Sequence, residues 1–184
     1  MRLGRSCRLA LLSCLLAGPA LPQELDFTAI PPLTDKDSIA AAKLPAAELK
    51  QIFDQIEQTS FDVPDSWTAE LRLRRMPIAG SDGLVVRGTA LLCGGTGNCQ
   101  TWLFRRSNAA WVNLFEGEAP IIASLGFRRH ASHGIPDLVA TAPVSAERST
   151  YVVYAFDGEV YRPGACYDVE DASAKRSAKP TACK

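Results

Sequence analysis

Apolar positions before residue 60 recur with the period of a helix. Between residues 45 and 59, Leu49, Ile52, Phe53 and Ile56 are spaced i, i+3, i+4, i+7, which places them on one face of a helix. Pro45 stands in the first turn, where its missing N–H is tolerated. The pattern predicts one amphipathic helix whose apolar face is directed at the core.

After residue 64 apolar and polar positions alternate, as in half-buried strands. The strand-like segments are too close together for the crossover helices of a parallel sheet, and Asp157-Gly158 is a strong hairpin signal. We therefore predict an α+β fold, in which one N-terminal amphipathic helix packs on a mainly antiparallel sheet of seven or eight short strands, with a turn at Gly80–Gly83 and a possible bulge at Gly88. The strand candidates are residues 67–75, 84–93, 100–106, 111–117, 120–129, 136–143, 150–156 and 159–169.

The first twenty residues have the three parts of a secretory signal peptide. Three arginines precede residue 9, residues 9–18 are apolar and uncharged, and Gly18-Pro19-Ala20 offers a small-residue cleavage site. An apolar run of about ten residues is too short to cross a bilayer of ~30 Å as a helix. We predict that residues 1–20 are a signal peptide, that the mature chain has no transmembrane segment, and that it is secreted or periplasmic.

Lipidation is an alternative route. The tetrapeptide Leu11–Cys14 resembles a bacterial lipobox, in which Cys14 is the acylated residue and anchors the protein as a lipoprotein. Only residues 9–13 separate Arg8 from Cys14, which is short for this role, so simple cleavage is favoured.

Removal of the signal peptide changes both the charge and the cysteine count. The chain has 20 basic and 20 acidic residues, and loss of the three early arginines leaves a net charge of about −3. Proteins that bind nucleic acid or anionic membranes usually have a basic face, which this composition does not offer.

Four cysteines remain after the signal peptide is removed: Cys93, Cys99, Cys166 and Cys183. An even number of cysteines in an oxidising compartment indicates two disulfides. Of three possible pairings, Cys93–Cys99 with Cys166–Cys183 is the most economical, because each closes a local loop.

The mature chain divides into three parts. Residues 21–43 contain three prolines and are predicted to be extended or loosely ordered. Residues 44–171 form a single α+β domain, long enough to bury a core. Residues 172–184 are small and polar, and we expect a poorly ordered tail tethered through Cys183.

The segment between Cys93 and Cys99 is the first candidate site. A phosphate loop needs a lysine and a following helix, and a redox pair needs Cys-x-x-Cys at a helix start; neither pattern is present. Zinc needs two further soft ligands, and export favours disulfides. What remains is a strand-to-strand loop with tied ends, here called the pinned loop (residues 93–99), which is either a stapled turn without a partner or a binding loop. Its glycines permit positive φ, Asn98 tolerates the left-handed region, and its N–H groups can bind an anion or a partner's carbonyl. The candidate binding residues are Gly94, Gly95, Thr96, Gly97 and Asn98.

The second candidate site contains both histidines of the chain. His130 and His133 are three residues apart, and Asp137 follows four residues later. Two imidazoles and a carboxylate can bind a metal ion and leave coordination positions open for a substrate or water. A His–Asp pair can act in general acid–base catalysis. The segment is rich in turn residues, which favours a solvated loop.

Three segments together carry a resemblance: LLCGGTGNCQTWLFRR, HGIPDLV and YVVYAFDGEVYRPGACYDV. They resemble a group of small exported bacterial proteins with a Cys-Gly-x-Thr-Gly-Asn-Cys loop, an aromatic strand and a terminal Asp-Gly hairpin. The resemblance covers residues 91–169 and implies no activity. The segments GIPDLV and FDGEVY are similar to FG-GAP propeller blades, although their Asp-rich calcium loop is missing and one copy cannot make a propeller. The tied loop also resembles that of bacterial lysozyme inhibitors, which insert a disulfide-bounded loop into the enzyme's cleft, although their loop carries a histidine that is missing here.

Two functions remain open. The first is an exported, non-enzymatic binding or envelope-associated protein, without a cofactor, whose pinned loop contacts an envelope protein or glycan. The second is a small metal-assisted or acid–base hydrolase that uses His130, His133 and Asp137. Convergence of these three side chains in the fold would favour the enzyme.

Overall fold

The computed structural model describes residues 25–60, 66–172 and 175–183. The predicted signal peptide, residues 1–20, and the lipobox at Cys14 lie outside the described residues. Within the described ranges, no helix is long and apolar enough to cross a membrane.

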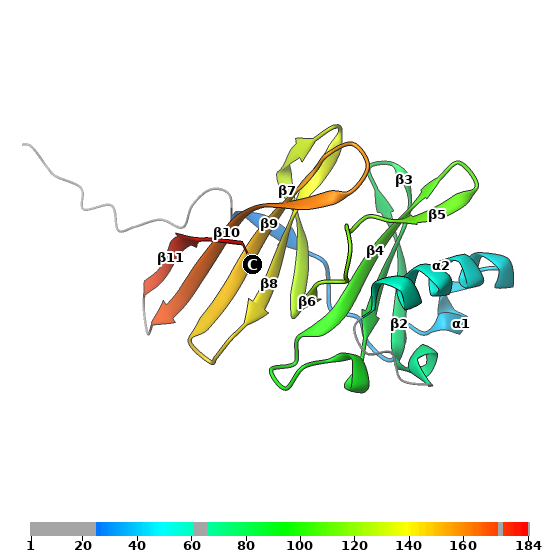
Figure 1. Ribbon diagram of the computed structural model, residues 1–184, viewed down its shortest axis with the longest axis horizontal. Coiled ribbons are helices and arrows are strands. Elements are labelled where there is room, and N and C mark those ends of the chain that lie inside the picture. Colours follow the sequence, from blue (N-terminus) through cyan, green and yellow to red (C-terminus); the bar gives the residue numbers. More distant parts are fainter. Residues whose placement is uncertain (1–24, 61–65, 173–174, 184) are drawn as a thin grey trace, which may run out of the picture.

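Two antiparallel sheets make up most of the molecule (Figure 1). The first has the order β1-β7-β8-β9-β10-β11, and the second has the order β2-β3-β4-β5 with β6 pairing to β4. Most neighbouring strands are consecutive in the chain, so hairpins build both sheets. The strands are β1 (Phe27–Ala29), β2 (Leu71–Ile78), β3 (Ser81–Gly88), β4 (Cys99–Ser107), β5 (Ala110–Asn113), β6 (Ile121–Ile122), β7 (Ser124–Ser132), β8 (Ile135–Pro143), β9 (Arg148–Phe156), β10 (Tyr161–Ala172) and β11 (Lys175–Thr181).

The antiparallel sheet expected from the sequence is confirmed, but the number of strands and sheets differs. The described residues form two sheets of six and five strands in place of one sheet of seven or eight. The segment 120–129 contains two strands, because the chain leaves β6 at Ile122 to join the other sheet in β7. Alternation within a strand shows that one face is buried, and it does not say which sheet the strand joins.

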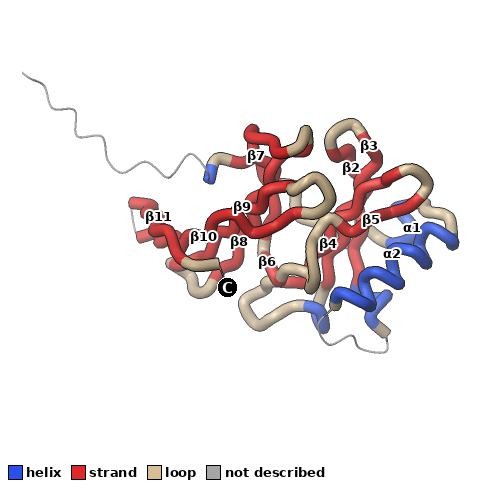
Figure 2. The backbone as a smooth tube through the Cα atoms, turned by 45° about the horizontal axis from the view of Figure 1, so that its top comes forward, coloured by secondary structure: helices blue, strands red, loops and turns tan. Residues whose placement is uncertain are grey.

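A helical layer covers the outer face of the second sheet (Figure 2). The predicted amphipathic helix is confirmed as α2 (Ala46–Thr59), and it follows the short α1 (Ile39–Ala42). Ile52 and Ile56 are fully buried, and Leu49 and Phe53 pack against the same cluster. This cluster joins the helices to the sheet, whose contribution includes Trp102, Phe104 and Trp111.

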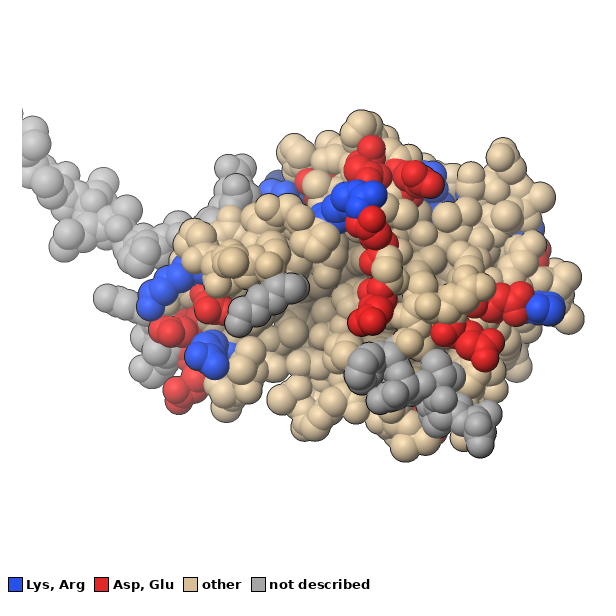
Figure 3. Space-filling model, in the orientation of Figure 1, with Lys and Arg blue, Asp and Glu red and all other residues tan. Residues whose placement is uncertain are grey.

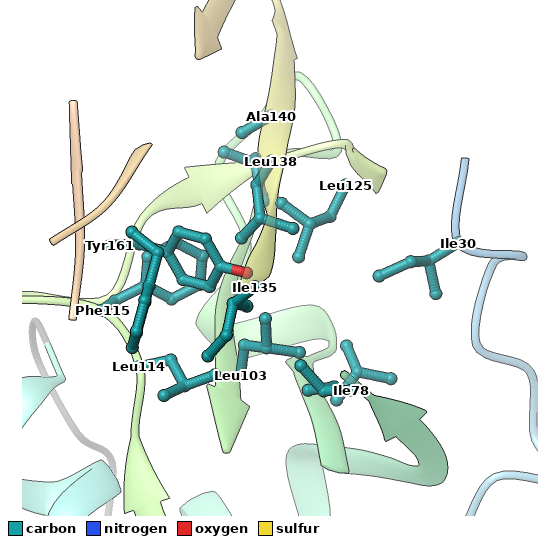
Figure 4. Close-up of a cluster of buried hydrophobic side chains, with 13 residues drawn as sticks. Ile30, Ile78, Leu103, Leu114, Phe115, Leu125, Ile135, Leu138, Ala140 and Tyr161 are labelled. Carbon is teal, nitrogen blue, oxygen red and sulfur yellow. The ribbon is translucent and has the colours of Figure 1, made fainter. Parts of the chain in front are cut away.

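The main core lies between the two sheets (Figure 4). Leu103 of β4, Leu138 of β8 and Tyr161 of β10 meet there, each nearly or fully buried. Because side chains alternate along a strand, Val85 points into this core and its neighbour Val86 points to the helical layer. The second sheet is therefore buried on both faces, which explains the nearly continuous apolar runs of β3 and β4.

A third, smaller cluster lies apart from these two and draws on strands of the first sheet. Val139, Val153 and Val169 come from β8, β9 and β10, and all three are buried. Tyr151 and Tyr167 face each other across β9 and β10 and belong to the same cluster. Each of these strands thus contributes to more than one apolar cluster.

Tight turns connect the hairpins. The β2–β3 turn consists of Ala79 (φ 48°) and Gly80 (φ 77°), so it begins one residue before the predicted turn. Gly83 lies within β3, where a Cβ would stand only 2.7 Å from the carbonyl oxygen of Met76, so a side chain does not fit. The Asp157-Gly158 turn is present. The Asp157 carboxylate accepts hydrogen bonds from the backbone N–H groups of Glu159 and Val160.

Two predicted strands are partly helical. Residues 67–70 form the 3-10 helix η2 (Trp67–Glu70), and the strand begins at Leu71. The segment 84–93 leaves the sheet after Gly88 and forms the 3-10 helix η3 (Ala90–Leu92). Gly88 is not a bulge in the β2–β3 ladder, which stays in register up to it; its missing side chain makes room for Leu92.

Both ends of the described chain are more ordered than the sequence predicts. The segment 21–43, expected to be extended or loosely ordered, contributes β1 and α1, and Ile30 is part of the main core. The segment 172–184, expected to be a poorly ordered tail, contributes β11, which pairs with β10. Pairing with a neighbouring strand supplies the backbone partners that local propensity does not reveal.

The two predicted disulfides are confirmed. Cys93–Cys99 joins Cα atoms 3.9 Å apart, and Cys166–Cys183 joins Cα atoms 5.2 Å apart. The second bond ties the end of β11 to β10, so the C-terminal strand is held covalently as well as by hydrogen bonds.

Candidate functional site

The pinned loop is a compact turn whose ends are tied twice. Beside the Cys93–Cys99 disulfide, the Gly94 N–H donates to the Asn98 carbonyl at 2.7 Å. Inside this ring the Gly97 N–H donates to the Gly94 carbonyl at 3.0 Å, which makes a tight turn. The loop therefore has a defined backbone shape.

Gly97, and not Asn98, takes the left-handed conformation expected here. Gly97 has φ 76°, and Asn98 is not among the residues with positive φ. The Asn98 side chain instead donates from Nδ2 to the Thr96 hydroxyl at 2.9 Å and to the Pro143 carbonyl at 3.0 Å. Since Pro143 ends β8, Asn98 fastens the pinned loop of the second sheet to the first sheet.

Arg87 holds the loop from the other side. Its guanidinium donates to the Gly97 carbonyl at 3.2 Å and also to the Ala123 carbonyl. Arg87 is not among the residues predicted for this site from the sequence, although the strand pattern contains a signal for it. Val85 faces the main core, and Arg87 lies two positions further on the same face of β3.

The tip of the pinned loop is exposed, from Gly94 to Gly97. Large apolar side chains flank it: Leu91 of η3 is 62% exposed, and Val144, next to Pro143, is 46% exposed. The face drawn in Figure 3 has acidic and basic side chains interspersed over mostly uncharged surface. The loop tip thus presents glycine backbone and the Thr96 side chain, with the apolar Leu91 and Val144 side chains beside it.

The second candidate site is only partly assembled. His130 Nδ1 lies 2.6 Å from Asp137 Oδ2, so one histidine and the aspartate converge. His133 does not join them: with Gly134 it forms the β7–β8 turn, and its ring lies near Gly158 of the β9–β10 turn. The segment is thus a hairpin whose turn, His133-Gly134, is exposed, so the solvated loop expected here is limited to that turn. Among the described residues, no group of three or more His, Cys, Asp or Glu side chains is arranged to hold a metal ion.

Asp137 is a buried carboxylate in contact with Arg128 and His130. It is 2% exposed, and Arg128 lies 3.4 Å from the oxygen that His130 contacts. Its other oxygen, Oδ1, is buried without a hydrogen-bond partner in the described structure. Burial, and secondarily the Asp137 charge, raises the pKa of Tyr161, whose hydroxyl donates to the Pro136 carbonyl. The group connects β7 to β8, and the His130 ring is its most exposed member.

Comparison of the chain with protein-family models, with curated proteins and with solved structures found no match.

Proposed function

We propose that this chain is an exported, non-enzymatic binding protein that contacts a cell-envelope protein or glycan through the pinned loop. The observation that carries the proposal is the contrast between a fixed backbone and an exposed tip. The disulfide, Asn98 and Arg87 hold the loop at both ends, while Gly94 to Gly97 face solvent. A rigid exposed loop loses little conformational entropy when it binds.

The surroundings of the loop support a contact surface. Leu91 and Val144 are two of the few large apolar side chains that are strongly exposed, and both flank the loop. Exposed apolar groups around a shaped loop are typical of protein-protein contacts. The signal-type N-terminus and the two disulfides support export, since disulfides persist in oxidising compartments.

The test uses a photo-crosslinking residue at Thr96 in protein expressed with its signal peptide, followed by isolation of the cell envelope. The proposal expects one dominant crosslinked partner or glycan, lost in the variants Leu91→Ser and Val144→Ser. Val112→Ser is the matched control, because Val112 is 36% exposed on β5 of the opposite region of the sheet. Crosslinks that persist in the flanking variants, or that Val112→Ser also removes, would contradict a contact through this loop. The intact mass of the recovered protein also distinguishes a chain cleaved after Ala20 from a chain that carries a lipid on Cys14.

A second candidate function is acid–base hydrolysis by His130 and Asp137. The observation in its favour is their 2.6 Å contact, in which a buried carboxylate orients an accessible imidazole. Its test is hydrolysis of a panel of ester, amide and glycoside substrates by the wild type and by His130→Ala. Hydrolysis that depends on His130 and is unaffected by loop variants would favour this function over binding.

A further inference from the structure

A cleft lies between the two sheets, where the chain passes from β1 to the helices. The passing segment, residues 30–33, forms one wall, and the link from β6 to β7 forms another. In Figure 1 this segment is the blue trace along the gap between the sheets, and Figure 4 shows Ile30 directed toward the main core. The Ile30 N–H donates to the Leu125 carbonyl at 2.8 Å, which holds the segment in place.

The lining of this cleft is apolar with a few polar groups. Two prolines, Pro31 and Pro32, and aliphatic side chains make up most of the wall. The polar lining residues are Arg87, Thr101 and Ser124. Arg87 and Thr101 stand opposite each other on β3 and β4. A mostly apolar pocket with a few placed polar groups is the usual form of a small-molecule site.

Arg87 brings an unneutralised positive charge to the cleft. The part-buried arginines Arg74 and Arg106 each form an ion pair, with Asp37 and Glu48. Arg87 forms no ion pair with a carboxylate among the described residues, and its two hydrogen-bond acceptors are neutral carbonyl oxygens. Desolvation lowers the pKa of its guanidinium, so the site destabilises the cation that it contains. An anion placed beside it would relieve this penalty.

We propose that the cleft binds a small aliphatic carboxylate, with the carboxylate on Arg87 and the carbon chain against the apolar wall. A guanidinium has five N–H donors in a planar fork that matches a carboxylate, and two carbonyls use only part of it. A single cation among apolar side chains suits a monoanion with a hydrocarbon part. A phosphate group would require more donors than the cleft provides.

The size of the cleft sets the size of the bound group. Its volume of about 40 Å³ is roughly that of three water-sized positions. A carboxylate and one or two carbons fit, and a longer ligand would extend into solvent. A free acid and the C-terminus of a peptide both present this carboxylate chemistry to Arg87, and the experiment below distinguishes the two sources.

This site is separate from the proposed contact of the pinned loop. None of the residues 93–99 lines the cleft, and Arg87 connects the two sites through its bond to the Gly97 carbonyl. The inference therefore does not rest on the loop function. Thr96→Ala, which changes the loop tip, should leave binding in the cleft unchanged.

The first experiment titrates the mature wild-type protein with propionate and, separately, with its neutral analogue propionamide, at ionic strength matched with sodium chloride. Binding is followed by nuclear magnetic resonance of backbone amides and arginine Nε–H groups. We expect saturable 1:1 binding of propionate that shifts the Arg87 and Ser124 signals, and at least about tenfold weaker binding of propionamide, because a charge-assisted hydrogen bond is lost. Equal binding of the two compounds, or no saturation by propionate at 100 mM probe, overturns the proposal.

Variants then assign the site. Arg87→Gln should weaken propionate binding at least about tenfold, and Arg75→Gln is the control, since Arg75 pairs with Asp82 near the β2–β3 turn and does not line the cleft. If Arg87→Gln does not fold, Ala123→Leu serves instead: it keeps the charge and fills the cleft that Ala123 lines, so it should also abolish binding. Wild-type affinity in either folded variant overturns the assignment.

N-acetylalanine, titrated in parallel, represents a peptide C-terminus. Tighter binding of N-acetylalanine than of propionate supports a chain end as the source of the carboxylate, and weaker binding supports a free acid.

Discussion

Single side chains connect parts of this chain that are far apart in the sequence. Asn98 joins the pinned loop to Pro143, and Arg74 binds Asp37 across a separation of 37 residues. Arg74 also donates to the carbonyls of Pro31 and Pro32, so it anchors the segment that borders the cleft. At this scale, polar side chains position the irregular segments and the apolar ones fill the cores.

Asn98→Ala should lower the free energy of unfolding by about 1–2 kcal/mol, because two hydrogen bonds are lost and the Pro143 carbonyl loses its side-chain donor. Thr96→Ala, at the exposed tip, is the comparison and should stay within about 0.5 kcal/mol. Urea denaturation of the mature protein measures both. A negligible effect of Asn98→Ala would mean that the disulfide, the backbone bond between Gly94 and Asn98, and Arg87 hold the loop without the Asn98 side chain.

Asp37 makes part of the stability dependent on pH. Hydrogen bonds from Arg74, and secondarily from Thr34, lower the pKa of the Asp37 carboxyl from 3.8 to about 2. The folded state therefore holds the charged form more strongly than the unfolded state does. The resulting stability, on the order of 1–2 kcal/mol after solvent screening, is complete above pH 4 or so and is lost as the pH falls toward 2.

Asp37→Asn should remove this pH-dependent contribution. Its midpoint of thermal unfolding should lie below that of the wild type at pH 6, and the difference should shrink as the pH falls from 4.5 to 2.5. Asp54→Asn is the control, since Asp54 pairs with Lys50 in solvent on α2. A difference that stays constant with pH would show that Asp37 acts only through its shape.

At the scale of elements, close backbone approach decides where segments dock. The strand β1 has only three residues, and it pairs with β7 at Phe27↔Arg128, Thr28↔Phe127 and Ala29↔Gly126. A short edge strand depends on its neighbour for register and for hydrogen bonds. Gly126 permits this docking, because a Cβ there would lie 2.7 Å from the Thr28 carbonyl oxygen and would clash with the Phe27 ring.

Gly126→Ala should displace β1 from β7 and lower the free energy of unfolding by about 1–3 kcal/mol, as overpacking does. Hydrogen exchange of the amides in residues 25–30 should speed up more than that of β8 or β9. Gly95→Ala is the matched control, since a Cβ at Gly95 meets nothing within 4 Å. Unchanged exchange in β1 would mean that the strand tolerates the extra methyl group by a small shift.

At the scale of the whole molecule, the helices and the two sheets should unfold together, because the strands of the second sheet pack on the helices with one face and on the first sheet with the other. The second sheet contributes one face to the main core and the other to the helical layer. The tryptophans and tyrosines are divided between the two sheets: Trp67, Trp102 and Trp111 belong to the cluster that joins the helices to the second sheet, and the four tyrosines lie in β9 and β10 of the first sheet. Tryptophan fluorescence and tyrosine signals therefore report on different parts of the molecule.

Leu138→Ala should lower the free energy of unfolding by about 2–5 kcal/mol, because Leu138 is fully buried between the sheets. Although Leu138 lies in the first sheet, the tryptophan transition of the second sheet should shift by the same amount as the tyrosine transition. Guanidinium denaturation followed by both signals tests this. Transitions that separate would show that the two sheets unfold independently.

Part of the fold and of the candidate sites could be predicted from the sequence. The helix at residues 46–59 was predictable because four apolar side chains on one face dominate a local, strongly periodic signal. The Asp157-Gly158 turn and both disulfides were also predictable, since turn chemistry and cysteine spacing act over short distances. The strand β1 was missed because three residues are too short for a periodic signal, and β11 was missed because its Lys, Ala and Pro residues are poor strand formers; both gain order from pairing.

The sequence by itself determined the apolar faces of the helix and strands, the local disulfide rings and the sharp turns, because each depends on neighbours within a few residues. Tertiary structure decided the rest. It divided the strands between two sheets, joined His130 to Asp137 while directing His133 into a turn, and placed Arg87 beside an apolar cleft. These outcomes depend on contacts between distant segments, whose free energies come from packing and desolvation that no local pattern contains.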